Sequence, residues 1–103
     1  MEVINEGSSI TLTVSFRDSE NALVTPLSMS YKIIDKDSNT VLDTQTVTPI
    51  TTSYDIDILG TINSMVNEDK ASEVREVIIS WEYNNSQTDV FEYDYKIKNV
   101  AGV

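Results

Sequence analysis

The chain has 103 residues, the size of a single domain, and its 40% apolar and 23% charged residues are typical of a folded protein. Its 7 basic and 17 acidic residues give a formal charge of −10. This charge argues against binding to nucleic acid or to an anionic membrane, because both attract clustered Lys and Arg. The chain contains neither Cys nor His, which excludes disulfides, thiolate metal sites and the commonest general base.

The N-terminal residues Met1 to Glu6 lack the basic and apolar segments of a signal peptide. No apolar run approaches the roughly 20 residues that a membrane span requires. We therefore expect the protein to remain where it is made until it assembles with a partner.

Alternation of apolar and polar residues predicts two strands near the start of the chain. The segment over residues 8–17 places four apolar side chains on one face: Ile10, Leu12, Val14 and Phe16. After a polar turn and Pro26, residues 28–35 do the same with Met29, Tyr31 and Ile33. Residues 36–39 then predict a hairpin loop, because Asp, Ser and Asn side chains form local hydrogen bonds that favour turns.

Residues 41–48 predict an edge strand, because both faces of this segment are largely polar. Val41 and Val47 would share one face with Leu42 on the other, and Pro49 would end the strand. An uncovered edge of this kind offers its backbone groups to a strand of a partner.

Residues 53–59 predict a further strand, with Tyr54, Ile56 and Ile58 facing inward. The pattern then changes, because Ile62, Met65 and Val66 recur at helical spacing. We predict one short helix over residues 61–71 that closes one end of the fold.

The last part of the chain predicts a hairpin of two strands, over residues 73–84 and 89–98. Their apolar faces carry Val77, Ile79, Trp81 and Tyr83 on the first strand and Phe91, Tyr93, Tyr95 and Ile97 on the second. We interpret the aromatic residues as core and not as a platform for stacking carbohydrate, because they lie on the faces that turn inward.

These segments together predict an all-β protein, an immunoglobulin-like β-sandwich of six or seven antiparallel strands in one domain over residues 1–103. Val3 and Ile4 would form the seventh strand. A small closed barrel remains the alternative, because it requires the same alternation.

No motif in the chain points to catalysis or to a bound metal. Residues 35–39 match the opening of a calcium loop, but Thr40 and Thr46 stand where such a loop needs Gly and Glu. Asp55 and Asp57 lie on one strand face roughly 7 Å apart, which fits a solvated acidic face better than an acid–base pair. We expect no enzymatic activity, no cofactor and no metal ion.

Several segments carry a resemblance to a known family. They are Asn5-Glu6-Gly7-Ser8-Ser9-Ile10-Thr11-Leu12-Thr13-Val14, Tyr54-Asp55-Ile56-Asp57-Ile58, Met65-Val66-Asn67, Glu73-Val74-Arg75 and Glu92-Tyr93-Asp94-Tyr95-Lys96-Ile97-Lys98-Asn99. As a series they resemble small immunoglobulin-like, virion-associated proteins of tailed bacteriophages over nearly the whole chain. The resemblance implies a non-enzymatic virion protein, assembled in the host cytoplasm, that decorates the outer surface of the capsid or is a minor capsid protein. It implies no catalytic residues.

Other functions fit the same residues: a tail or head–tail accessory protein, a stand-alone adhesion or carbohydrate-binding module, or an acidic inhibitor that mimics nucleic acid. We expect the partner to be the major capsid protein or another virion protein. Self-association into a homo-oligomer is an alternative. The predicted edge strand and the apolar termini supply the candidate contact residues: Val3, Ile4, Val41, Leu42, Val47, Val100 and Val103.

Overall fold

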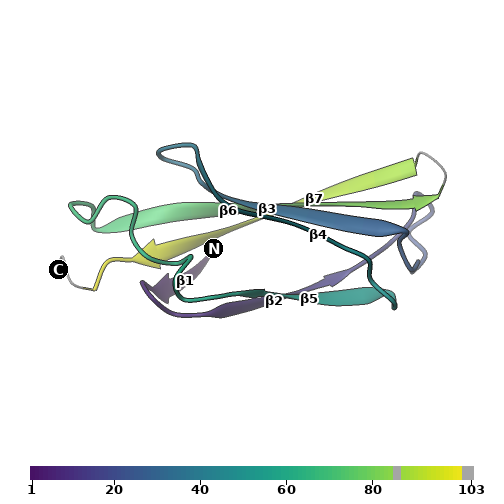
Figure 1. Ribbon diagram of the computed structural model, residues 1–103, viewed down its shortest axis with the longest axis horizontal. Helices are drawn as coiled ribbons and strands as arrows, with labels where there is room; N and C mark the ends of the chain where they lie inside the picture. The colour runs from purple at the N-terminus through teal and green to yellow at the C-terminus, as the bar shows by residue number, and fades with distance from the viewer. Residues whose placement is uncertain (85–86, 101–103) are drawn as a thin grey trace.

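The computed structural model describes residues 1–84 and 87–100, and it shows two β-sheets packed face to face (Figure 1). The larger sheet has five strands in the order β1-β7-β6-β3-β4, and the smaller sheet pairs β2 with β5. The strands are β1 (Glu2–Asn5), β2 (Ile10–Ser15), β3 (Ser28–Asp35), β4 (Thr40–Val47), β5 (Ser53–Ile58), β6 (Ser72–Asn84) and β7 (Gln87–Lys98). The predicted all-β sandwich is confirmed.

The core lies between the two sheets and follows the predicted alternation. Successive residues of β6 from Glu73 to Trp81 alternate between buried and half-buried positions. The smaller sheet contributes four buried side chains from β2 and β5: Ile10, Val14, Ile56 and Ile58. The larger sheet contributes Met29, Ile33, Val77, Ile79, Trp81, Tyr95 and Ile97. Apolar faces on both layers are therefore what hold the sandwich together.

The first strand corrects the expectation that every strand is antiparallel. β1 runs parallel to the end of β7, with Glu2 opposite Tyr95 and Asn5 opposite Lys98. The Glu6 N–H continues this pairing by donating to the Lys98 carbonyl at 2.9 Å. Gly7 then reverses the chain with a φ of 78°, a conformation that costs glycine little. The turn carries the chain from the larger sheet into the smaller one, so β1 joins a different layer from β2.

β4 is confirmed as an edge strand, but the predicted faces of its apolar residues are wrong. Leu42 and Val47 pack partly against the core, whereas Val41 is exposed. The cause is a register shift opposite Ile33 and Ile34, where Ile33 pairs with Asp43 and Ile34 with Val41. One extra residue in a strand reverses the faces of all residues beyond it.

The predicted helix over residues 61–71 is also wrong, because the segment between β5 and β6 consists of turns and bends. Met65 is buried as expected, but Val66 is exposed. Short helices are marginal without help from packing. Here the side chains of Glu73, Arg75 and Asn99 bind the backbone of this segment directly, so its amides and carbonyls need no helical partners.

Candidate functional site

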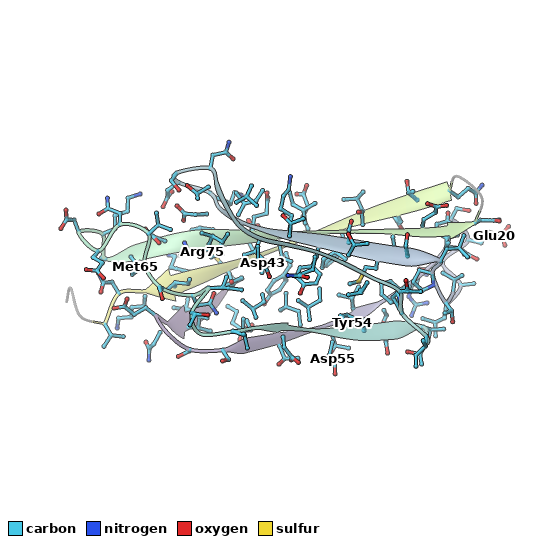
Figure 2. The ribbon with its side chains drawn as sticks, viewed as in Figure 1. Glu20, Asp43, Tyr54, Asp55, Met65 and Arg75 are labelled. Atoms are coloured by element: carbon cyan, nitrogen blue, oxygen red, sulfur yellow. The ribbon has the colours of Figure 1, made fainter. Side chains whose placement is uncertain are left out.

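One end of the sandwich contains a cluster of three buried charged side chains, which come from Asp35, Glu73 and Arg75. Arg75 on β6 is opposite Asp35 on β3 in the strand register. Its Nη1 donates to Asp35 Oδ1 at 2.6 Å and to Glu73 Oε1 at 2.9 Å, and the three side chains are essentially inaccessible to solvent. Figure 2 shows Arg75 at the same end of the molecule as Met65.

The two carboxylates of this cluster also bind backbone N–H groups. Glu73 accepts from the amides of Val66 and Asn67 at 2.8 and 2.7 Å. Asp35 Oδ2 accepts from the amide and the hydroxyl of Ser38 at 3.1 and 2.6 Å. Each charge is therefore paired and hydrogen-bonded, which is the condition under which buried charges are tolerated.

Two buried asparagines and a tyrosine extend this network along the same end. The Tyr95 hydroxyl donates to Asn63 Oδ1 at 2.7 Å, and Asn63 Nδ2 donates to the Ser8 carbonyl at 2.8 Å. Asn99 Nδ2 donates to the carbonyls of Glu68 and Lys70. Burial raises the pKa of Tyr95 to about 12, while the nearby Arg75 guanidinium opposes the rise. The network closes the end of the sandwich. Its polar groups form hydrogen bonds to the backbone of the loop, so its role is structural.

The residues considered for metal binding and catalysis lie apart from any shared site. Asp35, the first residue of the calcium-like segment, is bound by Arg75 and Ser38. Asp55 and Asp57 are exposed and accept hydrogen bonds from Thr13 and Thr11 at 2.7 and 2.8 Å. Figure 2 shows Asp55 on the outer side of β5 and Tyr54 on the side that faces the larger sheet. Within residues 1–84 and 87–100, no three His, Cys, Asp or Glu side chains are grouped to hold a metal ion.

An apolar groove lies between β2 and the larger sheet, and we call it the β2–β7 groove. It has a volume of about 420 Å³. It is lined by Glu2 from β1, by Thr11, Leu12, Thr13, Val14 and Ser15 from β2, and by Ile79, Trp81, Phe91 and Tyr93 from β6 and β7. Phe91 is 52% exposed there, although its position on β7 predicts burial, so the interpretation of the aromatic residues as core is wrong for Phe91. It is confirmed for Trp81 and Tyr95, which are buried.

The groove exists because the two sheets have unequal widths. The smaller sheet ends at β2, whose outer edge pairs with no described strand. On the opposite wall, β1 pairs only with the last residues of β7, from Tyr95 to Lys98. Where β1 ends, one wall of the groove is the open edge of β2 and the other is the open edge of β7. Apolar side chains lie between these two edges, an arrangement typical of sites that accept an additional strand.

The end of the groove is marked by a hydrogen bond from the Tyr93 hydroxyl to Glu2 Oε1, at 2.8 Å. Burial raises the pKa of Tyr93, and its bond to Glu2 raises it further, so the phenol is neutral at neutral pH. Glu2 is the one charged residue among those that line the groove. Such a lining suits recognition of a mainly apolar ligand more than it suits acid–base chemistry.

The predicted partner-binding residues are not brought together by the fold. Val3 on β1, Val41 on β4 and Val100 are exposed. Ile4, Leu42 and Val47 pack partly against the core, and Val103 lies outside the described residues. β1 and β4 stand at opposite edges of the larger sheet. Their role as contacts stays a prediction.

Sequence reasoning missed both the groove and the buried charges. The signal for the charges was present, because Glu73 and Arg75 share the alternation of Val77, Ile79 and Trp81. The signal for the groove was weaker. The number of strands does not reveal how they are divided between the two sheets. Because the smaller sheet has only two strands, it leaves Phe91 on β7 uncovered.

Comparison with known proteins adds no assignment: no family model, no curated protein and no solved structure matches the chain. In the part of the chain that the structure describes, no helix has the length and apolar character to cross a membrane.

Proposed function

We propose that the protein is a non-enzymatic binding module of a phage particle, attached to the outer surface of the capsid as a decoration or minor capsid protein. The observation that carries the proposal is the β2–β7 groove, an apolar site between two open strand edges with Phe91 half exposed in its lining. Exposed apolar surface rimmed by polar residues marks sites of protein interaction.

The charge of the chain supports an outer location. A formal charge of −10 repels packaged DNA and keeps a small domain soluble until it assembles. The sequence resemblance to small virion-associated proteins supports the phage particle as the assembly. A tail or head–tail position uses the same groove and differs only in the identity of the partner.

The carbohydrate-binding alternative has less support. Trp81, the best stacking residue, is 5% exposed, and its indole N–H donates to the Arg17 carbonyl at 3.2 Å. The aromatic surface that remains in the groove consists of Phe91 and Tyr93. The hydroxyl-bearing residues of β2 that line the groove include Thr11 and Thr13, whose hydroxyls are already directed to Asp57 and Asp55.

The test is mass spectrometry of purified particles of the virus that encodes the chain. We expect the protein to remain with the particles through a density gradient, and with emptied heads after they are separated from tails. Its absence from washed particles would contradict the proposal. Recovery with isolated tails would move it to the tail position.

A further inference from the structure

We propose that the β2–β7 groove accepts an extended segment of a different protein, alternately apolar and basic, which adds as a third strand to the open edge of β2. The inference deepens the proposed function, because it names how the partner is held. It rests on three features of the groove: the backbone groups along β2, the apolar floor and the charge of the chain.

The backbone of β2 is oriented to accept a strand. The Phe16 N–H donates to the Thr52 carbonyl at 2.9 Å, toward β5. Backbone groups of alternate residues point to the same side of a strand, so those of Leu12 and Val14 also face β5. The N–H and C=O groups of Thr11, Thr13 and Ser15 therefore face the open edge. The edge spans Ile10–Ser15, and six residues of strand extend about 20 Å.

The floor of the groove provides the apolar contacts. A strand paired with β2 would turn every second side chain toward the larger sheet, because strand side chains alternate between faces. Those side chains would cover Phe91 and Tyr93. The same alternation places the other side chains outward, beside Thr11 and Thr13.

Charge decides which kind of strand fits. Glu2 lines the groove and no Lys or Arg does, while Asp55 and Asp57 stand on the outer face one strand beyond β2. The incoming strand would lie about 10 Å from β5, which is close to the Debye length at about 0.1 M salt, so its attraction to these carboxylates is strongest at low ionic strength. A second copy of the chain would bring another charge of −10 to this face. A basic partner is attracted to the acidic surface, and a second copy is repelled.

A synthetic peptide of about eight residues, in which valine alternates with lysine, tests the proposal on the isotope-labelled full chain. We expect saturable binding, with shifted and exchange-protected amides at Thr11, Thr13 and Ser15. A valine–glutamate peptide should bind at least about tenfold more weakly. Equal binding of the two peptides, or shifts confined to the edge of β4, would overturn the proposal.

Variants of β2 test the backbone contact. Thr13→Pro removes an N–H that faces the open edge and should weaken peptide binding about tenfold or more. Thr13→Val keeps this N–H and should bind the peptide more tightly than Thr13→Pro does. Peptides with N-methyl groups on alternate residues test the same bonds without altering the protein. Undiminished binding by both methylation patterns would contradict strand addition.

Variants of β7 test the floor. Phe91→Ser should weaken binding roughly tenfold, because it removes the exposed ring that the partner covers. Val90→Ser is the matched control, since Val90 is similarly exposed but lies on the opposite face of β7. Equal losses in the two variants would overturn the assignment to the groove.

Sedimentation of the chain alone tests the competing occupant. A dimer that Thr13→Pro converts to a monomer would assign the groove to a second copy and overturn the proposal. The proposed function has a separate readout. If Thr13→Pro and Phe91→Ser proteins still attach to particles, the strand-addition inference fails while the virion role stands. If the unaltered protein binds the peptide but is absent from particles, the virion role fails while the strand-addition inference stands.

Discussion

Asp35 and Arg75 lie directly opposite each other on β3 and β6, and their side chains meet at 2.6 Å inside the protein. Glu73 binds the same guanidinium nitrogen, so one cation is shared by two buried carboxylates. The Nε of Arg75 has no hydrogen-bond partner among the described residues, which adds a desolvation cost. The attraction between these charges is therefore offset in part by the cost of removing them from water. The cluster holds the loop between β5 and β6 against the end of the sandwich.

Arg75→Met should destabilise the protein by about 3–5 kcal/mol, because it leaves two carboxylates buried without a cation. The measurement is urea unfolding followed by circular dichroism at neutral pH. Lys70→Met is the matched control, since Lys70 pairs with Asp37 on the surface, where both side chains are about two-fifths exposed. That change should cost at most about 1 kcal/mol. Similar losses in the two variants would show that the buried cluster contributes no more than a surface pair.

The Tyr95 hydroxyl makes stability depend on pH in the alkaline range. Its pKa is about 12 in the folded protein, where burial disfavours the phenolate, and near 10 when unfolded. Its contribution is complete below about pH 10 and is lost as pH rises toward 12, because the unfolded state releases the proton first. Unfolding midpoints between about pH 9 and pH 11.5 should fall more steeply for the original chain than for Tyr95→Phe.

Burial also raises the pKa of Tyr31 and of Tyr93, so the Tyr95→Phe variant should keep a smaller slope. At neutral pH the variant should be less stable by about 1–3 kcal/mol, because Asn63 Oδ1 loses a buried donor. Parallel curves for the two proteins would show that the Tyr95 proton is not linked to folding.

Phe16 should be among the most sensitive positions of the core. Its ring is fully buried and meets Trp81 edge to face, with ring centroids 5.4 Å apart. Phe16→Ala should cost about 3–5 kcal/mol through lost burial and the cavity left behind. Trp81 is the single tryptophan, so its fluorescence reports unfolding directly. Leu23→Ala, an exposed position in the adjoining turn, should change stability by less than about 0.5 kcal/mol.

Two glycines should respond differently to alanine. A Cβ at Gly60 would collide with the backbone carbonyl of Gly7, so Gly60→Ala must displace the main chain. A Cβ at Gly7 meets no atom within 4 Å, and its cost is the strain of a positive φ, about 1–2 kcal/mol. Thermal unfolding of both variants checks the order. A more stable Gly60→Ala than Gly7→Ala would mean that the two turns do not touch in solution.

Much of the fold can be predicted from the alternation of apolar and polar residues along the chain. The groove depends on how distant strands pair, which this alternation does not reveal. Alternation alone places Ile33, Val77 and Ile79 inward, and it also places Arg75 inward, although a charge there invites the opposite interpretation. The register shift beside Ile33 cannot be predicted from the sequence of β4, because both faces of this strand are largely polar and show no change in alternation. Strand pairing between distant segments decides the rest: that β1 joins β7, and that only β5 joins β2.

The parallel pairing of β1 with β7 has a mechanical consequence. Tension applied through the two ends of the chain pulls Glu2 and Lys98 in opposite directions along neighbouring parallel strands. All the hydrogen bonds between β1 and β7 then bear the load together, in shear, whereas an antiparallel terminal hairpin would open one bond at a time. Single-molecule pulling should therefore give a distinct force peak before the sandwich unfolds. Glu6→Pro, which removes the N–H donor to the Lys98 carbonyl, should lower that peak.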